Sequence, residues 1–281
     1  MVNNLNNSSN ANSLIQEQVA SMLVEPLEAE SVVLSSGVTV FNSSEPLRIP
    51  RLVDGFTPGF VAEGAEIPVA EPAEFSEIKL MPSERKGLKS ITVVTNELIR
   101  EAVFGVQNVL QQRIVKDVTN ALDTALLVGD GADNGITGIT NQPGVTTGTF
   151  DPSDPDSFLE ALALASSLEV KPNRWIINGA DFFALRKMKD ADGRYMIQET
   201  LQEDVKYVLF GVPVTVTNKI PAGTAILADM SQVAVVRDID PQITILNERY
   251  AEYDSVGIRV TTRYDEGLLH PEGVIVLNQE G

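Results

Sequence analysis

The chain has 281 residues, 43% of them apolar, which is enough for one or two domains with buried cores. Lys and Arg total 21 against 39 Asp and Glu. The formal net charge of −18 therefore argues against nonspecific binding to nucleic acid, although an acidic chain can also serve solubility alone. With no cysteine, no apolar run approaching the ~20 residues of a membrane span and no signal-peptide pattern, we expect no disulfide, thiolate chemistry, membrane span or secretion.

The first part of the chain predicts an arm. Residues 1–12 are rich in Asn and Ser and are expected to be disordered before assembly. Apolar residues at helical spacing between Leu14 and Leu23 predict a short amphipathic helix that docks on another part of the chain or another subunit. Short extended segments are expected after Ser31, at 32–34, 38–41 and 47–49.

Residues 59–94 predict a projecting hairpin arm. Strand-like runs at 60–62, 75–80 and 88–94 are interrupted by prolines, which suits exposed edges better than central strands. Acidic residues come first along this segment and basic ones follow: Glu63, Glu66, Glu71, Glu74 and Glu77, then Arg85, Lys86 and Lys89. These charges would face each other across one hairpin or complement a neighbour's surface. A solvated hairpin with scattered charge is the plainer alternative.

A long helix is predicted over 96–128. Thr95 suits its N-cap, Glu97 suits the first turn, and apolar residues recur at helical spacing up to Leu126. At ~1.5 Å per residue the rod would be about 50 Å long, weakened at Gly105 and ended by Gly129. One small core would not cover such a helix, so its apolar stripe is expected to lie along an extended sheet or on partner subunits.

The remainder predicts a mixed α and β region. Helices are expected after Asp154 and Pro155 and over 180–189, with a buried strand anchored by Trp175 between them. Further strands are expected at 212–217, 225–228, 233–236, 243–246, 257–263 and 274–277. The chain has no βαβ repeat and no internal repeat, so the fold class is α+β and not doubly wound.

No motif for catalysis, cofactor binding or metal binding stands out. Gly129-Asp-Gly131 follows a helix and lacks the Lys of a phosphate loop, so it is interpreted as a turn. The acidic and amide residues of two turns lack the ligand spacing of a calcium loop: Asp130, Asp133, Asn134, Asp190 and Asp192. His270 is the only histidine, which excludes ordinary His/Cys zinc sites, and no nucleophile elbow accompanies it. A catalytic pair of carboxylates stays open, although nothing marks one.

Four stretches, in this order, resemble parts of the major capsid proteins of tailed phages, which share the Hong Kong 97 fold. Phe60 to Val94 resembles the extension loop, and Gly129 to Gly138 resembles the loop after the spine helix. Arg174 to Tyr195 resembles the axial-domain signature. The strand pair that follows it in the family is matched by Phe210 to Asn218 and Pro221 to Asp229. The resemblance covers roughly Ser31 to Asn278.

The resemblance implies a division of the chain: an N-terminal arm (1–54), an extension loop (55–94), a peripheral domain with the spine helix (95–150), an axial domain (151–250) and a return to the peripheral domain (251–281). By similarity, axial domains meet around five- and six-fold axes, and peripheral domains meet at two- and three-fold positions. The implied function is that of a non-enzymatic major capsid protein, assembled in the host bacterial cytoplasm into pentamers and hexamers of an icosahedral virion shell.

The implied partners are further copies of the chain and enclosed double-stranded DNA, bound without sequence specificity, with no cofactor and no membrane. A portal and a decoration protein are possible partners, and scaffolding would be a separate protein because the N-terminal segment is short. Some family members cross-link an extension-loop Lys to an Asn on a neighbour, with a Glu assisting. Lys79, Lys86 or Lys89 could supply the amine, but a rough match finds Asp254 and Thr261 where the Asn and Glu should lie, which does not favour cross-linking.

Two other functions compete with this one. An encapsulin-like compartment would share the fold and hold a protein cargo, but the Asn- and Ser-rich start does not resemble its cargo-binding helix. A monomeric hydrolase or binding module would stay a monomer in gel filtration at low salt. The contents of purified shells separate the first alternative from a phage capsid.

Overall fold

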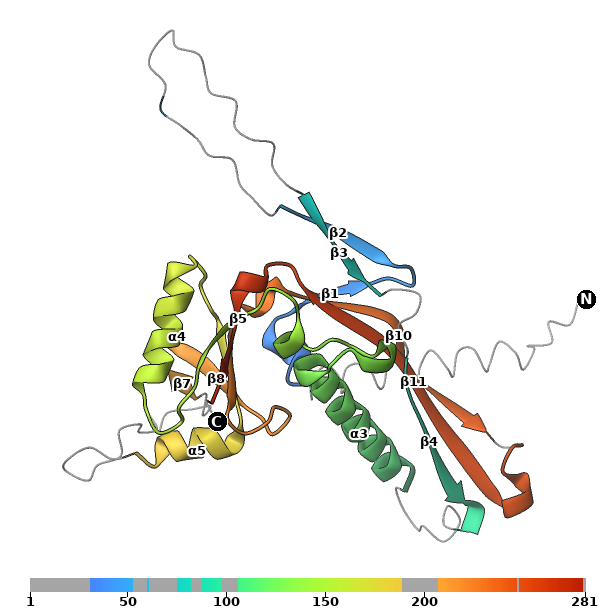
Figure 1. Ribbon diagram of the computed structural model, residues 1–281. Coiled ribbons are helices and arrows are strands. Elements are labelled where there is room, and N and C mark those ends of the chain that lie inside the picture. The colour runs from blue at the N-terminus through green and yellow to red at the C-terminus, as the bar shows by residue number, and fades with distance from the viewer. Residues whose placement is uncertain are drawn as a thin grey trace, which may run out of the picture.

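The chain folds as an α+β protein in which two sheets share one helix. The computed structural model describes residues 31–52, 60, 75–81, 87–97, 106–188, 207–246 and 248–279. Within these ranges it contains a six-stranded sheet, a four-stranded sheet and a two-stranded hairpin (Figure 1). Short 3-10 helices link them: η1 (Leu34–Ser36), η2 (Ala132–Asn134), η3 (Ile139–Asn141), η4 (Met230–Gln232), η5 (Ala251–Tyr253) and η6 (Pro271–Gly273).

The six-stranded sheet has the order β5-β12-β9-β6-β8-β7 and mixes parallel and antiparallel pairs. Its strands are β5 (Thr146–Thr149), β6 (Arg174–Ile177), β7 (Val208–Leu209), β8 (Val212–Val216), β9 (Thr224–Ala228) and β12 (Val274–Asn278). Side chains of β6, β9 and β12 are buried on both faces. Successive residues of a strand point to opposite faces, so these strands divide their side chains between two cores.

Helices α4 (Asp156–Ser167) and α5 (Gly179–Arg186) cover one face of this sheet (Figure 1). At the start of α4, Asp154 Oδ1 accepts a hydrogen bond from the Asp156 N–H at 3.0 Å. The Asn178 side chain caps α5 by accepting the Ala180 N–H at 2.8 Å. Trp175 is fully buried in this core, with the Phe158 ring edge-on to it at 5.4 Å. The predicted anchoring role of Trp175 is therefore confirmed.

The opposite face of the sheet shares a core with α3 (Val106–Val128) and the four-stranded sheet. Val118 and Leu122 of α3 belong to the same buried cluster as Ile226 of one sheet and Val235 and Val260 of the other. The apolar stripe of α3 is thus covered from two directions. A single core joins the two sheets.

The four-stranded sheet has the order β1-β10-β11-β4. Its strands are β1 (Thr39–Asn42), β4 (Leu88–Thr95), β10 (Val233–Leu246) and β11 (Ser255–Leu268). β1 pairs only with residues 234–237 of β10, so the sheet narrows to three strands beyond that point in the described chain. Two register shifts in β10, between Arg237 and Gln242, mark bulges there. Pro241 has no backbone N–H to donate to a neighbouring strand, and a bulge is a place in a sheet where this is tolerated.

A hairpin of β2 (Leu47–Leu52) and β3 (Phe75–Leu80) stacks on the four-stranded sheet. Leu80 and Met81 are buried against Ala234 and Val236 of β10. Side chains alternate along β10, so Val233 and Val235 face α3 while Ala234 and Val236 face the hairpin. The hairpin therefore covers part of the sheet face that points away from α3.

Several predicted elements are confirmed and three expectations are wrong. The strands predicted at 38–41, 47–49, 75–80, 88–94 and 175–177 occur. Residues 32–34 are not extended, because the chain turns there into η1. The strands at 233–236 and 243–246 are one strand, β10, because the bulges absorb the irregular stretch between them.

The third wrong expectation concerns the arm. β3 pairs with β2 and β4 pairs with β11, so the two ends of the predicted hairpin do not pair with each other. Of the separated charges, Glu77 faces Arg48 at 3.4 Å, while Glu63, Glu66, Glu71, Glu74, Arg85 and Lys86 lie outside the described residues. The strand predicted at 60–62, apart from Phe60 itself, and residues 98–105 of the predicted helix also lie outside them.

Sheet membership does not follow the contiguous ranges expected from the sequence. β10 precedes residue 250 but belongs to the four-stranded sheet, and β12 follows residue 251 but belongs to the six-stranded sheet. The boundary between the two sheets therefore does not coincide with a cut at 250. The assignment of ranges to arm, extension loop, peripheral and axial roles remains a proposal.

Candidate assembly surface

The two faces of β11 have different surroundings. Val260, Tyr264 and Leu268 belong to the core shared with α3. The intervening residues point to the opposite face, where a Cβ on Gly267 would lie 2.6 Å from Leu80 Cδ2 of the hairpin. The hairpin thus covers this face near Gly267. Further along the strand, the hairpin does not reach this face in the described chain, and we call this part the open face.

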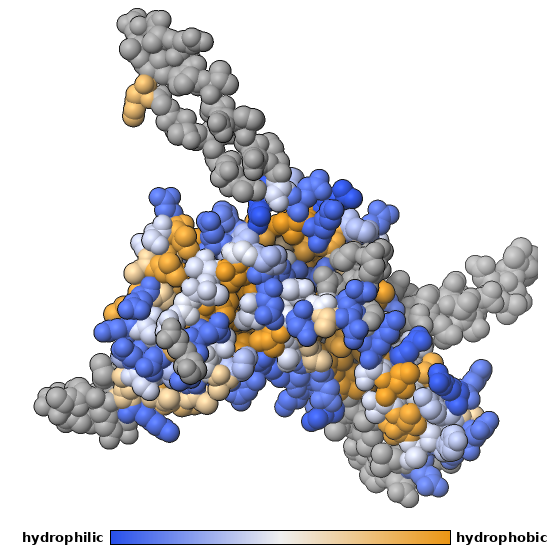
Figure 2. Space-filling model, viewed as in Figure 1, coloured by the Kyte–Doolittle hydropathy of each residue, from blue (hydrophilic) through white to orange (hydrophobic). Residues whose placement is uncertain are grey.

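The open face carries exposed apolar side chains. In the β4–β11 pairing, Ile91 lies opposite Arg259 and Val93 lies opposite Gly257, and directly opposed residues share a face. Ile91 is 46% exposed and Val93 is 47% exposed. The Tyr250 ring extends the patch, because it passes 2.5 Å from where a Cβ on Gly257 would be. Figure 2 shows apolar side chains gathered over β4 and β11.

Basic side chains border these apolar residues. Lys89 lies on β4 opposite Thr261, and Arg259 lies on β11 with Nη2 3.4 Å from Thr244 Oγ1. Arg249 places its guanidinium carbon 5.9 Å from the Tyr250 ring centre, within cation–π range. In a chain with a net charge of −18, the open face therefore combines apolar side chains with exposed basic ones.

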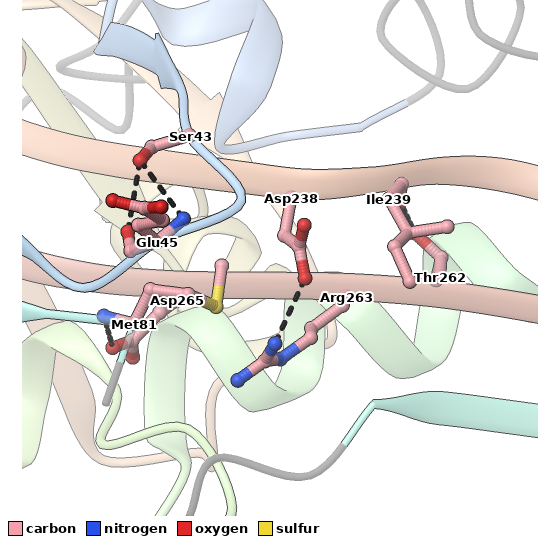
Figure 3. Close-up of polar contacts among 8 residues, drawn as sticks. All are labelled: Ser43, Glu45, Met81, Asp238, Ile239, Thr262, Arg263 and Asp265. Atoms are coloured by element: carbon pink, nitrogen blue, oxygen red, sulfur yellow. Dashed lines mark hydrogen bonds and ion pairs between the residues drawn. The ribbon is translucent and has the colours of Figure 1, made fainter. Parts of the chain in front are cut away.

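Polar contacts join β11 to β10 and to the residue after β3 in this part of the sheet (Figure 3). Arg263 Nη1 pairs with Asp238 Oδ2 at 2.8 Å, and the Thr262 hydroxyl donates to the Ile239 carbonyl at 3.0 Å across the first bulge. Asp265 Oδ2 accepts the Met81 N–H at 2.6 Å. Met81 has a φ of 54°, which is rare for a side chain of its size, so this bond holds the chain in an unfavourable turn where it leaves β3.

Among the described residues, those weighed for chemistry form no metal-binding cluster. Asp130 Oδ1 accepts the Ala132 N–H at 2.9 Å in an exposed turn, which confirms the turn interpretation. His270 is exposed at the start of η6. Asp190 and Asp192 lie outside the described residues. Within the described ranges no cluster of three His, Asp or Glu residues is placed to hold a metal, and no helix there has the length and apolarity of a membrane span.

The residues considered for cross-linking are also placed. Lys79 is exposed on β3 and Lys89 on β4, whereas Lys86 lies outside the described residues. Asp254 accepts a hydrogen bond from Asn96 Nδ2 at 2.7 Å, and Thr261 lies opposite Lys89. Sequence reasoning missed the open face itself, because only the pairing of β4 with β11 shows that Ile91 and Val93 point away from α3.

Comparison with known proteins gives the family. The model of the phage capsid family matches residues 11–279. The chain belongs to this family. A curated relative, the major capsid protein of Klebsiella oxytoca phage phiKO2, is 24% identical over an alignment of 296 positions, gaps included, that covers 94% of this chain and 67% of the relative.

Solved structures show the same fold. A capsid chain of a native GTA particle superposes with a TM-score of 0.72 at 18% identity, covering 89% of this chain and 90% of that one. A chain of Microbacterium phage Oxtober96 gives a TM-score of 0.72 at 18% identity, covering 89% and 91%. The expected Hong Kong 97-like α+β fold is confirmed. The protein is a major capsid protein, a structural component of an icosahedral virion shell and not an enzyme, and it associates with copies of itself.

Proposed function

We propose that copies of this capsid protein join at the open face of β4 and β11 and close, as pentamers and hexamers, into a shell around double-stranded DNA. The observation that carries the proposal is the exposure of Ile91 and Val93 on a sheet face whose other part is covered by the hairpin. Covering apolar surface of this kind yields roughly 25 cal/mol per Å² removed from water. Closed symmetry repeats each contact many times, so a weak contact is sufficient.

The occupant that fits the open face is the acidic stretch of a neighbouring copy. Residues 60–74, which precede the part of β3 that pairs with β2, contain four Glu and neither Lys nor Arg, and apolar residues lie between the acidic ones. Lys89 and Arg259 provide the complementary charge on the open face. Such complementarity guides the approach of partners and selects the register in which they dock.

The remaining roles in this proposal are those that the family resemblance implies. Residues 1–54 act as the N-terminal arm and 55–94 as the extension loop. In this division, 95–150 together with 251–281 form the peripheral domain, and 151–250 form the axial domain, which meets its neighbours at the five- and six-fold axes. β10 and β12 cross the division, because each belongs to the sheet of the other part. The enclosed DNA is not bound by sequence, because the acidic chain repels a polyanion. Separate scaffolding, portal and decoration proteins would complete the particle.

Electron microscopy of the purified full-length protein tests the proposal directly. We expect closed icosahedral shells, and we expect nuclease-protected double-stranded DNA inside virions that contain this chain. Protein cargo in place of DNA would favour the compartment alternative. A chain that stays a 30.4 kDa monomer at high concentration would refute self-assembly.

A charge reversal tests the open face. In the double variant Lys89→Glu with Arg259→Glu, the open face would repel the acidic stretch, so we expect closed shells to fall at least about tenfold while the subunits stay folded. The matched control is Lys116→Glu with Arg113→Glu, which makes the same change of charge on exposed positions of α3. If both double variants form shells equally well, the open face is not the contact.

A further inference from the structure

The turn that follows β3 has a strained backbone. Met81 has a φ of 54°, in the left-handed region that large side chains rarely adopt. The other described non-glycine residues with such a φ are all exposed: Asp133, Asn134, Glu169, Phe210 and Asp254. Met81 is instead 1% exposed, and its side chain has no oxygen or amide with which to bond the neighbouring backbone. Another part of the protein must therefore hold this conformation.

A buried carboxylate of β11 holds the turn. Asp265 Oδ2 accepts the Met81 N–H at 2.6 Å, and Asp265 is fully buried (Figure 3). Asp265 lies opposite Val236 in the β10–β11 pairing, so it points to the face that the hairpin covers. The bond therefore links the strained turn directly to the sheet on which the hairpin stacks.

The hairpin is anchored to the sheet at this end. Of the described side chains of β2, β3 and the turn, only those of Leu80 and Met81 are buried, and they pack against Ala234 and Val236 of β10. The remaining described side chains of the hairpin are half-buried or exposed. A two-stranded hairpin is at best marginally stable alone in water, so its order depends on this anchor. An anchor with so few buried contacts defines a unit that can open while the rest of the protein stays folded.

We propose that the hydrogen bond between Asp265 and Met81 is a latch that holds the β2–β3 hairpin against the four-stranded sheet, and that its breaking lets the hairpin undock from a body that stays folded. When the bond breaks, Met81 is free to return to an extended φ, and this relief of strain offsets part of the packing lost with Leu80. Undocking also uncovers Ala234 and Val236, so the latch controls how much of this apolar sheet face is exposed. The latch acts within one subunit and does not depend on the shell function.

The oxidation of two methionines tests the latch in the wild-type, full-length protein. Met81 and Met230 are 1% and 0% exposed, and Met230 belongs to the core shared by α3 and both sheets. Brief exposure to hydrogen peroxide converts accessible methionine to its sulfoxide, which peptide mass spectrometry locates. Because the hairpin opens without the core, we expect Met81 to react at least about tenfold faster than Met230. Equal rates would mean that the hairpin opens only when the whole protein unfolds, and would overturn the inference.

Asp265→Ala tests the role of the carboxylate. The variant has no acceptor for the Met81 N–H, so we expect oxidation of Met81 to rise about tenfold over wild type while Met230 stays protected. The matched control is Glu266→Ala. Glu266 is the next residue of β11 and is 3% exposed, but it lies opposite Val235 and so points toward α3. We expect the ratio of the two oxidation rates to stay at its wild-type value in this control.

Folded Asp265→Ala protein whose Met81 reacts no faster than in the wild type would contradict the latch. If circular dichroism and exposure of Met230 show that this variant does not fold, Leu80→Ala takes its place. That substitution weakens the apolar part of the anchor and keeps the carboxylate, so we expect faster oxidation of Met81 here as well. A folded Leu80→Ala variant with unchanged oxidation of Met81 would show that the anchor does not hold the hairpin.

Discussion

At the scale of single residues, two ion pairs of nearly equal length differ in their surroundings. Arg263 and Asp238 lie 2.8 Å apart with side chains 21% and 9% exposed, whereas Arg113 and Asp117 lie 2.9 Å apart with side chains 70% and 53% exposed. We expect Arg263→Ala to lower the free energy of unfolding by about 3 kcal/mol, since it leaves a carboxylate buried without this partner. The surface pair is worth only ~0–1 kcal/mol.

Urea denaturation of Arg263→Ala and of Arg113→Ala measures this difference. The two variants remove the same side chain, so the exposure of the pair is the main variable between them. Equal losses of stability would show that solvent screens the Arg263–Asp238 pair at the bulge of β10 as strongly as it screens the Arg113–Asp117 pair on the surface of α3.

Residue identity predicted the turns and caps but not the distant contacts. Asp154 and Pro155 before α4, and the turn at Gly129, follow local rules that act within a few positions. Asp123 instead interrupts an apolar pattern, and the sequence alone does not show that Ser31 is its partner. Likewise, Asp265 bonds to Met81 across 184 positions. Such pairs depend on the fold as a whole.

At the scale of elements, the hairpin of β2 and β3 depends on one small residue of β11. A Cβ on Gly267 would lie 2.6 Å from Leu80 Cδ2 and 3.2 Å from Ile78 Cγ2. In Gly267→Val the hairpin must move away from the sheet, so we expect a loss of about 1–3 kcal/mol in stability. We also expect fewer closed shells, because the segment that follows β2 would begin from a strand that has been displaced.

Thermal unfolding and shell counts on the same preparation check both effects. Gly148→Val is the control, and we expect it to disturb the structure less. Gly148 lies on the edge strand β5 of the other sheet, and a Cβ there would contact one side chain, that of Leu277. If Gly267→Val leaves both quantities unchanged, the close stacking of the hairpin has no role in either stability or assembly.

Strands were predictable where apolar alternation is regular, but their partners were not. β3 and β4 both occur as expected, yet β3 pairs with β2 and β4 with β11. The continuous strand β10 was divided in the prediction, because Pro241 normally ends a strand and the bulges that accommodate it have no local signal. Pairing is decided by which faces become buried, and this emerges only in the assembled sheets.

At the scale of the whole molecule, the core that joins the two sheets does not extend to the open face of β4 and β11 in the described chain. α3 faces one side of the four-stranded sheet and the hairpin covers part of the other, and we propose that a second copy covers the remaining apolar surface. A net charge of −18 on each copy opposes that approach. Assembly must therefore balance a long-range repulsion against contacts of short range.

This balance predicts how assembly depends on salt. The Debye length falls from ~30 Å at 0.01 M to ~8 Å at 0.15 M ionic strength, so added salt screens repulsion between whole subunits before it weakens charges in contact. We expect light scattering to show faster and more complete assembly between these concentrations, followed by a decline near 1 M as contacts of Lys89 and Arg259 are screened. The charge-reversed variant of the open face should lack the decline, because it has no favourable contact to lose. A steady decrease of wild-type assembly from the lowest salt upward would mean that attraction across the open face outweighs the repulsion of the whole chain.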